Sequence, residues 1–162
     1  MRPIYQSLII PFLLLHASLL AHCQVPCGIY NDAARIIQIQ EDFSTIQKAM
    51  TKIKELSLQQ DAKSINQLTR WIMTKDDHAS KIQNVVSDYF LTQRIKAKTE
   101  GSDYNTYVKQ TTTLHQILVS AMKCKQTVES GHVDEGLHQT KSFIDLYFDT
   151  HGKDHIKQMS ES

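Results

Sequence analysis

A short run of donor side chains stands out near the beginning of the chain. Residues 22–30 read His-Cys-Gln-Val-Pro-Cys-Gly-Ile-Tyr and contain two of the three cysteines of the 162-residue sequence. Cysteine thiolates and histidine imidazoles are side chains that transition metals bind readily. This run, called the hook segment below, is therefore the first candidate for chemistry.

The residues before the hook segment have the pattern of a cleaved leader. Arg2 supplies a positive charge, residues 8–20 are nearly all apolar, and small residues lead up to Ala21. The apolar run is interrupted and is shorter than the roughly 20 residues of a membrane span, so it is more typical of a signal peptide. We expect residues 1–21 to be removed and the protein to be exported, to a periplasm, the outside or an organelle lumen, without a membrane anchor.

Cleavage after Ala21 would make His22 the first residue and would create a new metal donor. The α-amine and imidazole of His22 would then lie beside the backbone nitrogen and thiolate of Cys23. Pro26 can turn the chain so that Cys27 returns toward Cys23, and Gly28 has no side chain to obstruct the turn. Two nitrogens and two sulfurs in one plane, with an imidazole to the side, suit Ni(II) or Cu(II) better than zinc. The donors thus indicate a redox metal.

Two other interpretations of the same segment remain open. Cys23 and Cys27 could close a small disulfide in a secreted helical bundle with a structural or binding role, although that pairing would leave Cys124 as an odd thiol. The segment could also hold nickel or copper without turnover. Cys124 itself lies beside an apolar stripe and is expected to be a buried or half-buried thiol, not a metal ligand.

The rest of the chain has the periodicity of four helices. Apolar residues recur at spacings of three and four, which places each stripe on one helix face. The stripes cover residues 36–53, 65–89, 107–128 and 133–147. Polar residues 57–61 and glycine-containing segments 98–103 and 130–132 separate them and are read as turns. Short turns between long helices predict an all-α, up-down-up-down four-helix bundle with an N-terminal metal-binding hook, within a single domain of residues 22–162.

Two parts of this pattern are less regular. The second stripe begins with Ile65, Leu68 and Ile72 and is interrupted at residues 75–78, which we expect to be an exposed or strained patch within one long helix. From about Thr150 the chain becomes polar, and a frayed C-terminal tail is expected.

Composition excludes several partners. The net charge is +1 and there is no long basic run or glycine-rich phosphate loop, so neither nucleic acid nor a nucleotide is expected as a ligand. Six histidines follow the hook segment, and each is expected to be solvated or singly hydrogen-bonded: His78, His115, His132, His138, His151 and His155.

The hook segment closely resembles the N-terminal nickel hook of nickel superoxide dismutases, written H-C-x-x-P-C-G-x-Y. A second run, Ser-Asp-Tyr-Phe at residues 87–90, resembles that family's S-D-Y-F segment. The family is a small four-helix bundle, so the resemblance extends over residues 22–162. It implies disproportionation of superoxide to dioxygen and hydrogen peroxide, with one nickel ion per subunit alternating between Ni(II) and Ni(III), in a homohexamer.

The resemblance also implies a role for each site residue. His22 supplies its amine and an axial imidazole, Cys23 supplies its backbone nitrogen and its thiolate, and Cys27 supplies a thiolate. Tyr30 and Tyr89 would line the approach to the metal and order water or small anions there.

The sequence departs from the family pattern at two positions. Gln24 stands where members commonly have an acidic residue. Ile37 stands where many members have a carboxylate that supports the axial imidazole, and no equivalent of the family's supporting arginine can be assigned from the sequence.

Overall fold

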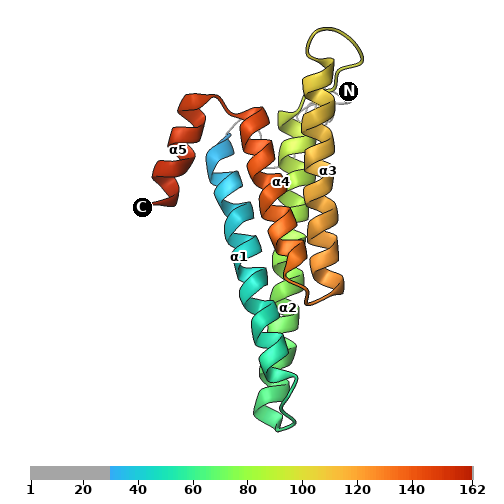
Figure 1. The fold of residues 1–162 in the computed structure, drawn as a ribbon, viewed down its shortest axis with the longest axis vertical. Helices are drawn as coiled ribbons and strands as arrows, with labels where there is room; N and C mark the ends of the chain where they lie inside the picture. The colour runs from blue at the N-terminus through green and yellow to red at the C-terminus, as the bar shows by residue number, and fades with distance from the viewer. Residues whose placement is uncertain (1–29, 162) are drawn as a thin grey trace, which may run out of the picture.

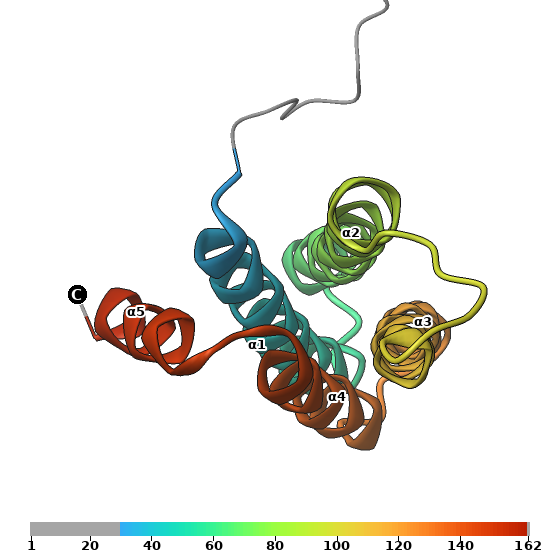
Figure 2. The ribbon, with the colours of Figure 1, turned by 90° about the horizontal axis from the view of Figure 1, so that it is seen from above.

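A computed structural model describes residues 30–161 of the chain. The regular elements of this part of the chain are all helices, without strands: α1 (Asp32–Leu56), α2 (Ala62–Asn84), the π-helix η2 (Val85–Arg94), α3 (Tyr104–Gln126), α4 (Gly131–Tyr147) and α5 (Thr150–Ser160). The four long helices α1 to α4 run alternately up and down (Figure 1). Seen from above, each lies beside the next, and α4 returns to α1 (Figure 2). The predicted all-α bundle is confirmed, whereas the hook lies outside the described residues.

The helix ends have identifiable causes. The side chains of Asn31 and Asp61 accept hydrogen bonds from backbone N–H groups in the first turns of α1 and α2, which satisfies donors that have no partner within the helix. Gly101 adopts a φ of +97° in the turn before α3, a conformation that favours glycine. The turn predicted at residues 130–132 begins earlier in the chain: α3 ends at Gln126, and Gly131 is already the first residue of α4.

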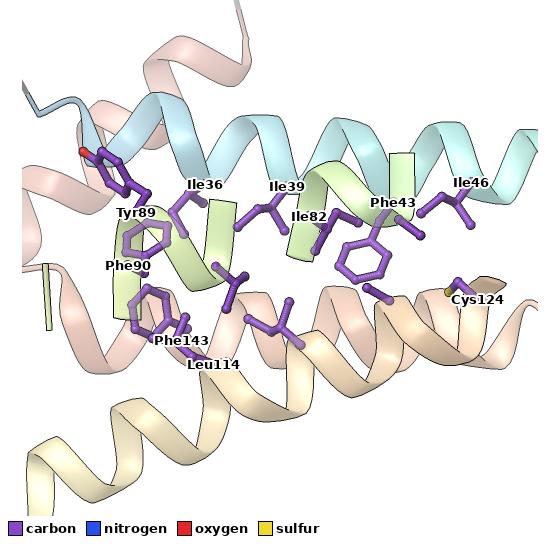
Figure 3. Packing of buried hydrophobic residues seen from close by; sticks show 14 of the residues in the cluster. Ile36, Ile39, Phe43, Ile46, Ile82, Tyr89, Phe90, Leu114, Cys124 and Phe143 are labelled. Carbon is purple, nitrogen blue, oxygen red and sulfur yellow. The ribbon is translucent and has the colours of Figure 1, made fainter. Parts of the chain in front are cut away.

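One continuous apolar core fills the space between the four long helices (Figure 3). Its largest fully buried side chains come from every helix of the bundle: Ile36, Ile39, Phe43, Ile46, Met50, Ile82, Val86, Phe90, Leu114, Ile117, Val133 and Phe143. Cys124 is also fully buried, as predicted. Burial of these side chains supplies most of the driving force for folding.

The first half of α2 lies outside this core. Ile65 and Ile72 are 51% and 40% exposed, so the beginning of the second apolar stripe is not part of the core. The reason is visible in Figure 1: the α1–α2 hairpin extends beyond the turn that joins α3 to α4. No helix of the described bundle therefore covers the face that carries these two residues.

Lys75 also differs from its prediction. The expected exposed or strained patch at residues 75–78 is regular helix, and Lys75 is one of the most buried residues of α2, with 3% of its surface exposed. Its ammonium donates to the backbone oxygens of Cys124 and Lys125, both at 2.7 Å. A charged side chain is tolerated inside the protein when its donors find partners, and the end of α3 supplies them.

The residues after Thr150 form helix α5 in place of the expected frayed tail. Asp149 accepts a hydrogen bond from the backbone of the first turn, and Ile156 is 7% exposed where α5 packs against α1. One apolar anchor and a cap thus order a segment that is otherwise polar. None of the helices within residues 30–161 is long and apolar enough to cross a membrane.

Candidate functional site

The predicted site residues divide into two groups. His22, Cys23 and Cys27 lie outside the described residues. Tyr30 and Tyr89 are described: Tyr30 immediately precedes the capping residue of α1, and Tyr89 lies in η2. The site can therefore be built from the bundle toward the hook.

Tyr30 and Tyr89 are in contact. Their ring centroids are 5.9 Å apart with an interplanar angle of 70°, an edge-to-face arrangement that aromatic pairs favour. Tyr30 is 43% exposed, whereas Tyr89 is only 3% exposed. In Figure 3 Tyr89 stands at one end of the core with its hydroxyl directed toward the beginning of α1. The bundle thus brings the two predicted tyrosines together where the hook segment joins it.

The carboxylate of Asp32, the first residue of α1, is the centre of this end of the bundle. The Tyr89 hydroxyl donates to Oδ1 at 2.5 Å and the Tyr147 hydroxyl donates to Oδ2 at 2.7 Å. Arg94 donates through Nε to both oxygens, at 2.9 and 3.1 Å, and through Nη2 to Oδ2 at 2.8 Å. Asp32 therefore joins α1 to η2 and α4.

Two guanidinium groups lie over the two tyrosine rings. Arg94 is 4.2 Å from the centroid of the Tyr30 ring, and Arg35 is 5.5 Å from that of Tyr89. A cation over an aromatic face is attracted by the negative potential of the ring. Arg94 thus donates hydrogen bonds to Asp32 and lies over the ring of Tyr30.

The π-helix explains how Tyr89 and Arg94 reach the same carboxylate. In an α-helix of 3.6 residues per turn, residues five apart point about 140° away from each other. In a π-helix, by contrast, residue i bonds to residue i+5. The backbone N–H of Ile95 donates to the Phe90 oxygen five residues earlier, at 2.8 Å. The side chains of Thr92 and Gln93 likewise donate to backbone oxygens five residues before them. The wider turn brings Tyr89 and Arg94 to one side.

The electrostatics of the cluster follow from these contacts. Burial raises the pKa of Asp32, but the hydrogen bonds from Arg94, Tyr89 and Tyr147 outweigh burial and hold this pKa below its usual value. Burial and the hydrogen bond to Asp32 raise the pKa of Tyr147 to about 12 and that of Tyr89 further still. At neutral pH the cluster therefore contains a carboxylate, a guanidinium and two neutral phenols.

A shallow pocket of about 430 Å³ opens beside the cluster. Its lining includes Tyr30, Asp32 and Arg94 from the cluster and Phe148 and His155 from the segment around α5. It lies next to the residue at which the hook segment meets the bundle. The pocket leaves room against the cluster for a further group.

Three residues of this cluster were not predicted as site residues. Asp32 and Arg94 have no periodic signal, because an α-helical reading places Tyr89 and Arg94 on different faces. Tyr147 ends the fourth apolar stripe, which indicates a core residue, whereas it is half-buried and its hydroxyl donates to Asp32. The one signal in the sequence that could draw attention to Asp32 is its place as an acidic residue two positions after the hook segment.

Metal-binding side chains do not gather elsewhere in the described part of the chain. Among residues 30–161, no group of three or more His, Cys, Asp or Glu side chains could hold a metal ion. His78 is paired with Asp42, Nδ1 to Oδ1 at 2.6 Å, and the buried thiol of Cys124 has its pKa raised to about 11 by burial. The imidazole and two thiolates of the hook segment remain the donor set suited to a soft or borderline metal.

Comparison with known protein families gives one match. Residues 17–151 match the family model described as nickel-containing superoxide dismutase. The chain belongs to this family. The match includes both the hook segment and the Ser-Asp-Tyr-Phe run. Searches of curated proteins and of solved structures found no match.

Family membership establishes the class of enzyme. The protein is a nickel-dependent superoxide dismutase, an oxidoreductase with nickel as its cofactor and superoxide as its substrate. The donor set of the hook segment, with one imidazole and two thiolates, fits that metal.

Proposed function

We propose that this chain disproportionates superoxide at a nickel ion bound by residues 22–30, with His22, Cys23 and Cys27 as the ligands. The observation that carries the proposal is the contact between Tyr30 and Tyr89. These two tyrosines, which are predicted to line the approach to the metal, come together where the hook segment joins the bundle. The lack of an alternative metal-binding cluster within residues 30–161 supports the same location.

Bound nickel supplies one-electron oxidation and reduction, by alternating between Ni(II) and Ni(III). In the overall reaction one superoxide anion loses an electron and leaves as dioxygen. A second superoxide gains an electron and two protons and leaves as hydrogen peroxide. The amine and imidazole of His22, the backbone nitrogen and thiolate of Cys23 and the thiolate of Cys27 would hold the metal, and the electron-rich thiolates would favour its oxidised state.

The tyrosines act on what approaches the metal. Tyr30, which is partly exposed, offers a hydroxyl that can order water or a small anion, and Tyr89 forms the wall behind it. The guanidinium groups of Arg35 and Arg94 lie over the two rings. The charge of Arg94 is balanced by Asp32, so Arg35 adds the net positive charge beside a path used by an anionic substrate.

The proposal includes the state of the mature protein. The leader pattern of residues 1–21 supports export and cleavage before His22. Family resemblance supports a homohexamer, and the exposed Ile65 and Ile72 on α2 offer an apolar face for subunit contacts. Intact mass of the exported protein tests the first point and light scattering after gel filtration tests the second.

Matched cysteine variants test the metal assignment. Cys23→Ala and Cys27→Ala are expected to abolish nickel binding and superoxide consumption, measured by metal analysis and by stopped-flow spectroscopy. Cys124→Ala is the control, because that thiol is buried in the core, and it should keep both. Nickel and activity in either hook variant would refute the assignment. The intact mass of the wild-type protein gives two further outcomes that would overturn the assignment. One is a mass that still includes the leader. The other is a mass lower by two hydrogens, which indicates a Cys23–Cys27 disulfide, in protein that binds no nickel.

A further inference from the structure

We propose that Asp32 is a positioning residue of the nickel site, which fixes Tyr89 directly and Tyr30 through Arg94. This arrangement leaves the Tyr30 hydroxyl hydrogen for ligands of the site and commits that of Tyr89 to Asp32. The inference rests on the proposed function, since it concerns tyrosines beside the hook segment.

The donors around Asp32 leave its carboxylate with one orientation. Its two oxygens accept from Tyr89 on one side, from Tyr147 on the other, and from the fork of Arg94 between them. Hydrogen bonds to an ionised group are shorter and stronger than neutral ones, and a forked guanidinium adds geometric specificity. Because the donors come from η2 and α4, the carboxylate is fixed relative to three helices at once.

Arg94 carries this constraint to Tyr30. Its Nε and Nη2 donate to Asp32, and the Cζ atom of the same guanidinium lies over the Tyr30 ring, 4.2 Å from the ring centroid. A guanidinium can use its edge and its face at once, whereas a lysine ammonium cannot. Tyr30 is the last residue of the hook segment, so the contact holds the end of the hook against the bundle.

The two phenols consequently have different roles. A tyrosine hydroxyl has one hydrogen to donate, and that of Tyr89 is used in the short bond to Asp32. Within residues 30–161 the Tyr30 hydroxyl has no hydrogen-bond partner, and the residue is 43% exposed. A small anion in this position needs donors, and Tyr30 supplies one while the oxygen of Tyr89 can only accept.

The alternative is that Asp32 only ties the helices together, and matched variants separate these roles. Asp32→Asn keeps the shape but replaces one acceptor oxygen with a donor. Asp42→Asn is the control: Asp42 is a buried carboxylate ten residues along the same helix, bonded to His78 and remote from the tyrosines. Both variants disturb a buried polar pair on α1, and only the first touches the proposed positioning network.

Each variant is compared with the wild type by nickel content, the nickel electron paramagnetic resonance spectrum, kcat/KM and thermal unfolding. Asp32→Asn should keep its nickel, change the spectrum and lose about 10-fold or more in kcat/KM, a typical effect of removing a group that orients a metal site. Asp42→Asn should change thermal unfolding alone. Equal spectra and rates for Asp32→Asn and the wild type would overturn the inference.

Arg94 and the tyrosines give a second test with azide as the probe anion. Tyr30→Phe should weaken azide binding, seen in the nickel absorption bands, whereas Tyr89→Phe should leave it within about 2-fold. Arg94→Lys should behave like Arg94→Gln, because a lysine cannot bond and stack at once. Rescue by lysine, or a larger azide effect from Tyr89→Phe than from Tyr30→Phe, would contradict the assigned roles.

A readout that is independent of turnover separates this inference from the proposed function. Ring resonances of Tyr30 in ¹³C-tyrosine-labelled protein should move in Asp32→Asn and stay in place in Asp42→Asn. An inactive wild type with these shifts would refute the proposed function and keep the contact network. An active wild type whose Tyr30 resonances are unmoved by Asp32→Asn would refute the network alone.

Discussion

The ammonium nitrogen of Lys75 lies 2.7 Å from the backbone oxygen of Cys124, near the end of α3. It makes a second bond of the same length to the oxygen of Lys125 and pairs with Asp76 at 2.8 Å. The last carbonyls of a helix have no partner within that helix and carry partial negative charge. A buried lysine of α2 thus caps α3 and joins the two helices.

Replacing Lys75 should therefore destabilise the bundle. Lys75→Met keeps the length of the side chain and removes the charged donor, so two carbonyls lose their partner at a cost of about 2–4 kcal/mol. Urea unfolding measures the loss. Lys52→Met is the control, because the Lys52–Glu55 pair is exposed and should contribute less than about 1 kcal/mol. Equal losses in the two variants would show that the buried contacts contribute little.

The main helices could be predicted from the sequence because burial imposes a period. The stripe from Ile36 to Ile53 becomes the buried face of α1, and Ala79, Ile82 and Val86 continue the core from α2 into η2. The metal-binding role of the hook residues stays a prediction, and it could be made because the donor side chains are local to nine residues. Neither step needed a long-range contact.

Features that depend on distant contacts could not be predicted. Lys75 interrupts an apolar stripe, and only the position of the end of α3 shows why it is buried. Asp32 and Arg94 meet because η2 is a π-helix, a register that periodicity does not reveal. Ile65 and Ile72 continue a stripe past the end of the α3–α4 hairpin, and a pattern does not show where its partner helix ends.

Acid should weaken the contribution of Asp32 to stability. Its folded pKa is held below the unfolded value, so the contribution is present above about pH 4 and is lost as the pH falls through the folded pKa. The free-energy cost of Asp32→Asn, measured by urea unfolding, should therefore shrink between about pH 5 and pH 2.

The pKa of Asp42 is shifted in the opposite direction, so its contribution to stability changes with pH in the opposite sense. Burial raises its pKa and outweighs the bond to His78, so wild-type stability falls as the pH rises from the unfolded toward the folded pKa. Asp42→Asn should thus be less costly than Asp32→Asn at pH 7. A pH-independent cost for Asp32→Asn would contradict the assignment of its pKa.

At high pH the two phenols that bond to Asp32, those of Tyr89 and Tyr147, should ionise later than ordinary tyrosines. The pKa of Tyr147 is raised to about 12 and that of Tyr89 is raised further, against about 10 in the unfolded chain. Their contribution to stability is present below pH 10 and is lost as the pH rises toward the folded pKa values. Absorbance titration should show both phenols ionising late in the wild type and earlier in Asp32→Asn. Unchanged titration in that variant would mean that burial alone raises these pKa values.

Gly136 tests how closely α1 and α4 pack. A Cβ atom placed on Gly136 would overlap the ring of Phe43, which is fully buried between the helices. Gly136→Ala should gain about 1 kcal/mol of helix propensity, but the overlap costs about 1–3 kcal/mol or more because a packed core yields little. We therefore expect a net loss of stability in chemical unfolding.

Two further variants show whether that loss comes from the Phe43 ring. Gly131, the first residue of α4, has open space around the position that a Cβ atom would take, so Gly131→Ala should be neutral or slightly stabilising. In a Phe43→Leu background the ring is gone, and Gly136→Ala should then be neutral or favourable, which gives a coupling energy between the two sites. An equal cost of Gly136→Ala in both backgrounds would place the strain in the helix backbone, away from the α1–α4 contact.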